Sequence, residues 1–212
     1  LCVEAGFLGT NVLSRMQMLP EDNLVENYMD EKQLAQLLKV LTTHENRPVC
    51  LVCLWLLSTG SRSGEALLAK WSDIDRDNRA WKIPAVNAKG KRVRSIALND
   101  TALGVLDQLD TKDTSEWLFV NKQTNLPFTT ISKTWERLRI KAGLPHLRIH
   151  DLRHQYASML INSGRSLFEV QQALGHRDYT TSQRYAHLST KSLQDAANSA
   201  SVMIQNAMPP SA

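Results

Sequence analysis

The chain has 212 residues, of which 42% are hydrophobic and 22% charged, and its formal net charge is +4. That composition fits one sizeable globular domain, and the modest positive charge is compatible with a polyanionic partner without identifying one. Three cysteines exclude a secreted disulfide framework and a four-cysteine zinc site; because no run of about eighteen apolar residues occurs, no membrane-spanning helix and no membrane partner is predicted.

The first two predicted helices follow a polar segment that ends near Met29. Asp30 is a good helix cap, and leucines then recur at helical spacing. These leucines are Leu34, Leu37, Leu38 and Leu41. A second helix, residues 47–58, is apolar almost all round and is predicted to lie at the centre of the core. Cys50 and Cys53 fall inside it, so we interpret them as buried thiols rather than a redox or metal motif, and expect a reducing, cytoplasmic environment.

A small sheet and further helices are predicted after the second helix. Thr59-Gly60 ends that helix and places Arg62 at the turn before a third helical stretch. Turn signals separate three short strands, which we interpret as an antiparallel sheet. The strands are expected at residues 73–75, 81–83 and 92–98, and the later helices at residues 100–109, 129–142, 151–162, 167–174 and 190–207. The predicted fold class is therefore mainly α with a small antiparallel β-sheet (α+β).

Tyr185 is the candidate nucleophile for cutting a phosphodiester, because a tyrosine phenol can attack phosphorus and conserve the bond energy in an ester. Arginine suits the charge of such a transition state, since a planar guanidinium matches two phosphate oxygens. Arg62 and Arg153 each lie at a predicted helix start, where backbone N–H groups also favour an anion. Lys89, in a predicted hairpin turn, can reach over a bound strand to protonate the leaving group, and Lys91 is a close competitor.

Two histidines complete the candidate set, because His150 and His176 can donate to phosphate or move a proton near neutral pH. The chain carries a series of boxes in a fixed order. They are TGSRSGEAL at 59–67, Lys89, HDLRH at 150–154, LGH at 174–176 and Tyr185. In residue type, order and spacing these boxes resemble the catalytic domain of the tyrosine recombinase (phage integrase) family.

The resemblance implies a role for each matched position. Arg62, Arg153 and His176 would hold the scissile phosphate, and Lys89 would protonate the 5′-hydroxyl. Tyr185 would end the cleavage step as a 3′-phosphotyrosyl link to the DNA.

The remaining matched positions have supporting roles. By the resemblance, His150 would help to activate or position the nucleophile, and Glu65 would brace the arginine site. His154 is interpreted as structural. No cofactor and no metal ion is implied, since arginines and a lysine take the part that a divalent ion has in other nucleases.

The resemblance also predicts domains and partners. Residues 29–189 match the catalytic domain, residues 1–28 are interpreted as the remnant of an N-terminal core-binding domain and linker, and residues 190–212 as a C-terminal helix and tail. We therefore interpret the chain as a fragment of a longer protein. The implied partners are double-stranded DNA recombination sites, a homotetramer assembled on that DNA, and a directionality factor. The helix after Tyr185 is expected to pack into a neighbouring protomer.

Other basic residues are candidates for contacts with backbone phosphates, which position a protein on DNA without reading its sequence. Lys91, Arg92 and Arg94 are favoured because they lie in or next to the predicted hairpin. The tryptophans have apolar neighbours, and we assign them to the fold rather than to base stacking. They are Trp55, Trp71, Trp81, Trp117 and Trp135.

Several functions share this chemistry. An integrase of a mobile element is preferred over an Xer-type resolvase because of the longer loops between boxes, such as residues 113–125. A type IB topoisomerase uses the same tyrosine chemistry, but the LGH box and the segment after Tyr185 favour a recombinase. A DNA-binding regulator that no longer cuts is disfavoured by the complete set of candidate residues.

Overall fold

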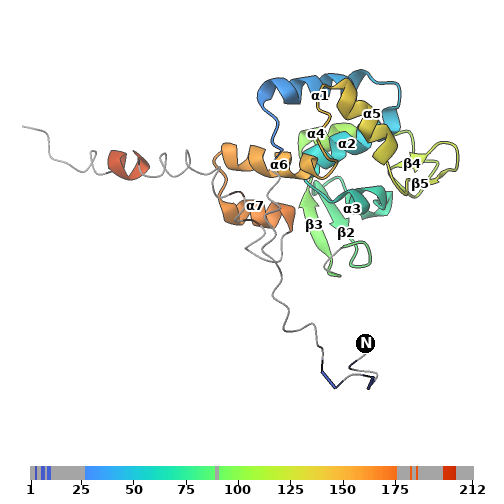
Figure 1. Cartoon of the computed structure of the whole chain (residues 1–212), viewed down its shortest axis with the longest axis horizontal. Coiled ribbons are helices and arrows are strands. Elements are labelled where there is room, and N and C mark those ends of the chain that lie inside the picture. The colour runs from blue at the N-terminus through green and yellow to red at the C-terminus, as the bar shows by residue number, and fades with distance from the viewer. Residues whose placement is uncertain are drawn as a thin grey trace, which may run out of the picture.

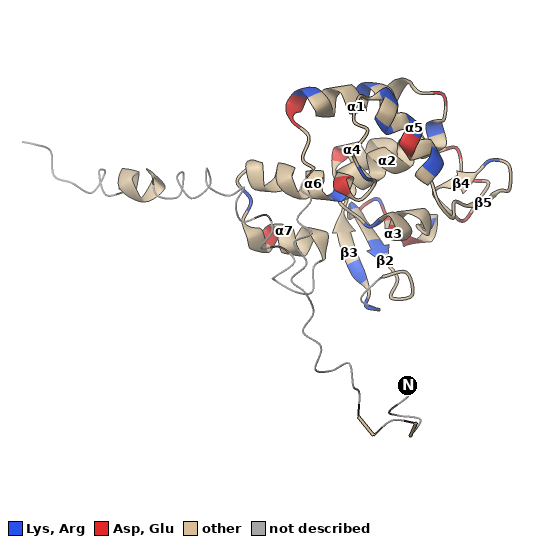
Figure 2. Ribbon diagram, in the orientation of Figure 1, with Lys and Arg blue, Asp and Glu red and all other residues tan. Residues whose placement is uncertain are grey.

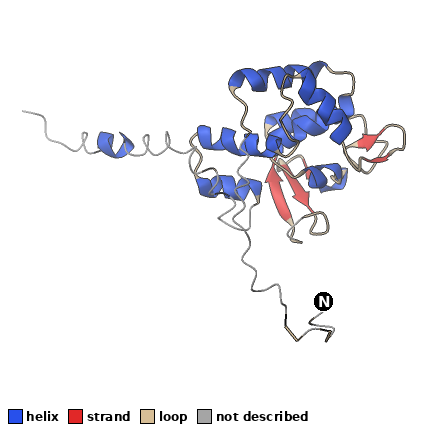
Figure 3. Cartoon of the chain, viewed as in Figure 1, coloured by secondary structure: helices blue, strands red, loops and turns tan. Residues whose placement is uncertain are grey.

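The computed structural model describes residues 27–88, 91–175 and 198–203, together with residues 3, 6, 7, 9, 10, 182 and 185. Helices predominate, and the strands form two small sheets (Figure 3). In chain order the elements are α1 (Glu31–Thr43), α2 (Arg47–Thr59), α3 (Ser63–Leu67), the 3₁₀ turn η2 (Trp71–Asp73), β1 (Ile74–Asp75), β2 (Ala80–Ile83), β3 (Arg94–Ala97), α4 (Asp100–Asp107), β4 (Val120–Asn121), β5 (Leu126–Pro127), α5 (Ser132–Lys141), α6 (Asp151–Asn162) and α7 (Leu167–Leu174). The predicted α+β class is confirmed. Across the described ranges, no helix combines the length and apolar character needed to cross a membrane.

Local signals account for the ends of the first two helices. The backbone N–H of Gln33 donates to the Asp30 carboxylate at 2.8 Å, and the Gln33 side chain accepts from the Asp30 N–H at 3.0 Å, so the two residues cap α1 reciprocally. Asn46 caps α2 through its side-chain oxygen. Gly60 ends α2 in the left-handed region, with φ of 61°, a conformation that costs glycine little.

The core is built around α2, which packs against α1, α3, α4 and α6 (Figure 1). Every residue of α2 from Val49 to Thr59 is buried, as its all-round apolar pattern predicts. The Trp55 ring centre lies 5.3 Å from that of Trp81 on β2 and 6.0 Å from that of Phe119. Truncating such a buried tryptophan typically costs about 3–5 kcal/mol, so this aromatic cluster joins helix and sheet strongly.

The remaining tryptophans and the two cysteines of α2 also belong to the packing. Trp135 is buried and donates from its indole nitrogen to the Leu147 carbonyl at 3.1 Å. Trp71 and Trp117 are half-buried at the edge of the core. Cys50 and Cys53 are buried free thiols whose pKa values burial raises, which confirms their assignment to the core.

The three predicted strands form one antiparallel sheet in the order β1-β2-β3. Trp81 lies opposite Ile96 in this sheet, and Ile83 opposite Arg94. Side chains alternate along β2, so that Trp81 and Ile83 are buried while Lys82 is exposed. The second hairpin, β4-β5, was not predicted: β4 falls in the loop expected at residues 113–125, and β5 follows that loop directly. Its strands have two residues each, too short for an alternation pattern to reveal them.

The last helices form a second, smaller apolar cluster beside the main core. α6 and α7 pack together, and the C-terminal end of α7 lies near β3 (Figure 1). The extended chain before α1 also lies on α6, because the Met29 N–H donates to the Gln155 side chain at 2.8 Å. Residues 198–203 are helical, and the rest of the helix predicted at 190–207 lies outside the described residues.

Candidate active site

The first box forms a tight turn between α2 and α3. The Thr59 hydroxyl donates to the Trp55 carbonyl at 2.6 Å and lies 3.0 Å from the Ser61 hydroxyl, which holds the turn that follows α2. Arg62 then caps α3 in extended backbone geometry. Its side chain keeps 29% of its surface exposed, so the guanidinium is both anchored and accessible.

Glu65 is the buried centre of this part of the site. Its side chain is only 2% exposed, and its carboxylate accepts from Arg62 twice, from the backbone N–H at 3.0 Å and from the guanidinium at 3.1 Å. Arg94 donates at 2.6 Å to Oε2, the same carboxylate oxygen that accepts from the backbone N–H of Arg62. Burial alone would raise the pKa of Glu65, but the charges and hydrogen bonds of Arg94 and Arg62 hold it below its ordinary value. The carboxylate is therefore ionised at neutral pH and fixes two arginines at once.

Arg153 joins three motifs that are distant in sequence. It lies in the first turn of α6 and is 3% exposed. One guanidinium nitrogen donates to the Gly60 carbonyl at 2.5 Å, and the other donates to the Leu174 carbonyl at 2.8 Å. A single side chain thus ties the end of α2 to the end of α7, directly before the LGH box histidine.

The arginines carry more positive charge than the site neutralises. Burial, together with the nearby charges of Arg62 and Arg94, lowers the pKa of Arg153 to about 9, although the charge of Glu65 opposes this shift. Three guanidinium groups with one carboxylate leave a local charge of 3 − 1 = +2. A largely buried group of charges with that excess is suited to bind an anion such as a phosphodiester.

Tyr185 lies against α6, the helix that carries Arg153. Its side chain is 1% exposed and packs with Ala157, Ile161 and Val170. The phenol oxygen is 2.8 Å from Nδ1 of His154. His154 was interpreted as structural; it contacts the candidate nucleophile directly.

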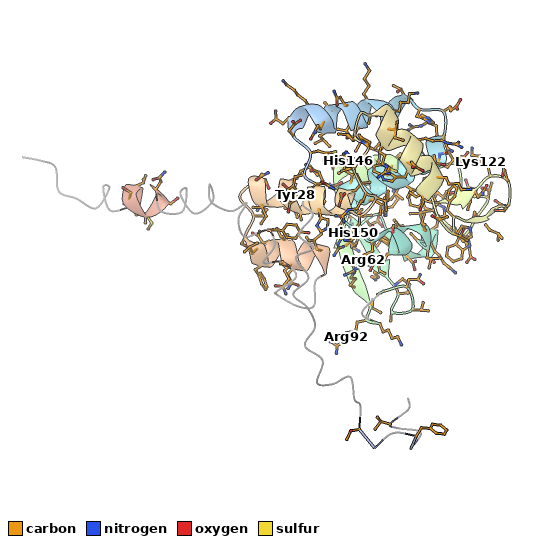
Figure 4. The ribbon with its side chains drawn as sticks, in the orientation of Figure 1. Tyr28, Arg62, Arg92, Lys122, His146 and His150 are labelled. Atoms are coloured by element: carbon orange, nitrogen blue, oxygen red, sulfur yellow. The ribbon has the colours of Figure 1, made fainter. Side chains whose placement is uncertain are left out.

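His150 is the residue directly before α6. Partial desolvation and the nearby charge of Arg153 lower the pKa of His150, so its ring stays neutral down to a lower pH than an ordinary histidine does. Its ring stacks edge-on against His154 with 4.8 Å between ring centres. Figure 4 shows His150 close to Arg62, and the charge of Arg62 contributes to the lowered pKa of His150.

Two candidate residues, Lys89 and His176, lie outside the described residues. Lysines and arginines mark both strands of the β2-β3 hairpin that flanks Lys89 (Figure 2). Lys91 and Arg92 are exposed. Arg94 differs, since its side chain is only 15% exposed and is paired with Glu65.

Two features of the site were not predicted: the contact of His154 with Tyr185 and the inward position of Arg94. The sequence held a signal for the first feature, because His154 follows the box arginine and lies four residues from His150, on the same helix face. The inward position of Arg94 had no such signal. Alternation along a strand grouped it with Arg92, but β3 begins only at Arg94. Within the described ranges, no three His, Cys, Asp or Glu side chains gather in a way that could hold a metal ion.

Comparisons with known proteins place this geometry in context. Residues 27–192 match the model of the phage integrase family. The integrase of Salmonella phage P22 is 30% identical over 162 residues, covering 71% of this chain and 42% of that protein. The tyrosine recombinase XerC of Corynebacterium glutamicum is 33% identical over 151 residues, covering 68% of this chain and 48% of that protein. The chain thus spans less than half the length of these two relatives.

Solved structures show the same fold. A XerH site-specific recombinase bound to a palindromic difH substrate, in a post-cleavage complex, superposes with a TM-score of 0.69 at 27% identity. The match covers 87% of this chain and 57% of that one. The catalytic domain of bacteriophage HP1 integrase superposes with a TM-score of 0.62 at 24% identity, covering 81% of this chain and 93% of that domain.

Proposed function

Because the chain belongs to the phage integrase family, we propose that it is the catalytic domain of a site-specific DNA recombinase that cuts and rejoins strands through Tyr185. The observation that carries this proposal is the convergence made by Arg153. Its guanidinium bonds to Gly60 and to Leu174, so two boxes that lie far apart in sequence meet at one cationic site. The candidate nucleophile Tyr185 packs against α6, the helix that carries Arg153, and its phenol is hydrogen-bonded to His154.

The proposed cleavage step needs no co-reactant beyond the DNA. The Tyr185 oxygen attacks phosphorus, the bond from phosphorus to the 5′-oxygen breaks, and a 3′-phosphotyrosyl ester forms. Arg62 and Arg153, with His176, stabilise the non-bridging oxygens in the transition state. Lys89 gives a proton to the departing 5′-oxygen. Attack by a 5′-hydroxyl on the ester reverses the step and rejoins the strand.

The phenol proton passes to the histidine pair on α6. His154 is in place to accept it, since its Nδ1 is 2.8 Å from the phenol oxygen. His150 lies beside His154 and is unprotonated at neutral pH, because its pKa is lowered. Tyr185 is 1% exposed in this state, so the phenol has to shift out of its apolar surroundings to meet a phosphate.

A nicked suicide substrate tests the proposal, because loss of a short strand traps the covalent adduct. Wild-type protein should form an adduct with DNA that survives denaturation. Tyr185→Phe should form none, and Tyr156→Phe, which removes the hydroxyl of a tyrosine that is not a candidate catalytic residue, should react like wild type. Absence of an adduct with the wild type, or an adduct with Tyr185→Phe, would contradict the assignment.

We further propose that the partner is double-stranded DNA carrying paired recombination sites, bound in the cytoplasm by four copies of the protein and a directionality factor. Support comes from the relatives, since the XerH structure holds a recombination substrate. The segment at 190–207 would couple neighbouring copies. Its deletion should impair recombination between two sites more than cleavage of one site, and equal loss of both would contradict a coupling role.

A further inference from the structure

Arg94 occupies a place that the roles above leave unexplained. It opens β3, and its guanidinium donates to Glu65 at 2.6 Å. Glu65 in turn accepts from the backbone and side chain of Arg62. Arg94 is therefore connected to Arg62 through a carboxylate that is 2% exposed.

The same guanidinium packs on the turn that leads to His176. Gly175 ends α7 with φ of 64°, and a Cβ added there would lie 2.8 Å from Nη1 of Arg94 and 2.9 Å from its Cδ. The glycine thus lets the arginine lie directly on the backbone. Arg153 donates to the carbonyl of Leu174, one residue earlier, so two arginines hold this turn from different elements.

Burial separates Arg94 from Arg92, the neighbour with which it was grouped as a contact to DNA. Arg92 is exposed, whereas the side chain of Arg94 is 15% exposed. Its Nε and Nη1 atoms are buried and, among the described residues, have no hydrogen-bond partner. Buried unpaired donors are costly. We infer that this cost is retained because the same side chain fixes both Glu65 and the turn at Gly175.

We propose that Arg94 is a positioning residue of the active site, holding Arg62 through Glu65 and the LGH turn through Gly175 rather than binding DNA as a backbone contact. The proposal rests on the proposed recombinase chemistry. It links β3 to both phosphate-binding segments, so that displacement of one side chain would disturb both.

The test uses the full chain, single-turnover cleavage of the suicide substrate at saturating DNA, and a separate DNA-binding titration at constant salt. Arg94→Ala should lower the cleavage rate constant by roughly 10²-fold, the size expected when catalytic groups move by about 1 Å, and change the DNA dissociation constant by less than about threefold, since fewer phosphate contacts are lost than for an exposed arginine. Arg94→Lys can still pair with Glu65 but lacks the forked guanidinium that also covers Gly175. Its cleavage rate constant should therefore lie between those of the wild type and Arg94→Ala.

Arg76→Ala is the matched control. Arg76 is an exposed arginine paired with Asp107 on the surface, and its loss should leave both cleavage and binding unchanged. If Arg94→Ala does not fold, by circular dichroism and thermal unfolding, Arg94→Lys decides on the same two measurements.

A pH profile separates positioning from a purely structural role. The charged groups that face Glu65 are Arg94 from β3, Arg62 from the start of α3 and Arg153 from α6. Without Arg94 the carboxylate takes a proton at higher pH, so the acid limb of the cleavage profile should move upward. Cleavage within about twofold of wild type with an unshifted acid limb, or a defect confined to DNA binding, would overturn the inference. Failure of wild-type protein to form any adduct would instead contradict the proposed function.

Discussion

Replacing Glu65 with glutamine should destabilise the protein far more than an equivalent change at the surface. The substitution keeps the shape of the side chain but removes the only carboxylate shown to pair with Arg62 and Arg94 within the described site. Removing one partner of a buried ion pair typically costs about 3–5 kcal/mol. Because Arg62 is 29% exposed and its half of the interaction is screened by water, we expect a loss of about 3 kcal/mol in the free energy of unfolding.

Urea unfolding of the full chain at pH 7 measures this loss, with Glu116→Gln as the control. Glu116 pairs with Lys70 at 2.8 Å, but its side chain is 61% exposed. A surface pair of this kind contributes about 0–1 kcal/mol, so the control should unfold close to wild type. The comparison separates the burial of the carboxylate from the mere loss of a negative charge.

The same experiment at lower pH checks the electrostatic origin of the loss. The folded-state pKa of Glu65 lies below its ordinary value of 4.5. Its contribution is therefore complete above about pH 4.5 and disappears as the pH falls through the folded-state pKa. The difference between wild type and Glu65→Gln should shrink over that window. A difference below about 1 kcal/mol at pH 7 would refute the reasoning, as would a difference that does not change at low pH.

The other predictions concern two glycines and two histidines. Gly60→Ala should destabilise the fold by more than about 1 kcal/mol, because φ is 61° and the new Cβ would lie 2.3 Å from Tyr156. Gly64→Ala, where a Cβ meets nothing within 4 Å, should instead stabilise α3 by about 0.5–1 kcal/mol. Thermal unfolding of both variants measures the two effects. His154→Phe keeps a ring but removes the nitrogen beside the nucleophile, so it should cost about 1 kcal/mol and slow adduct formation on the suicide substrate; an unchanged rate would argue against proton transfer at that position. His150 has a lowered pKa, so the unfolded chain binds its proton first and stability should rise with pH through the range just below 6.5; His150→Gln should flatten that rise in urea unfolding measured across the range.

Much of the fold was predictable because its signals are local. The Asp30 cap, the all-apolar α2 and the glycine that ends it each depend on residues within a few positions of one another. The helices at 151–162 and 167–174 were predicted with the bounds that the structure shows. The β4-β5 hairpin was missed because two-residue strands carry no period that a pattern can detect.

The functions of single side chains were harder to predict. Residue type and order identified Arg62, Arg153 and Tyr185 as candidates, but not which groups they contact. Arg94 was expected at the DNA surface, and the structure places it 15% exposed against a buried carboxylate. A sequence pattern cannot show this, because the direction of a strand side chain depends on where the strand begins and on what packs over it.

The sequence by itself determined the helices, their caps and the order of the motif boxes, because helix formation and capping are decided by hydrogen bonds between residues three or four apart. Only the tertiary structure decided that Arg153 bonds to Gly60, 93 positions away, and that Glu65 holds Arg94 across 29 positions. Those contacts arise when burial in a common core forces distant polar groups to satisfy one another. The cationic site therefore exists only in the folded chain.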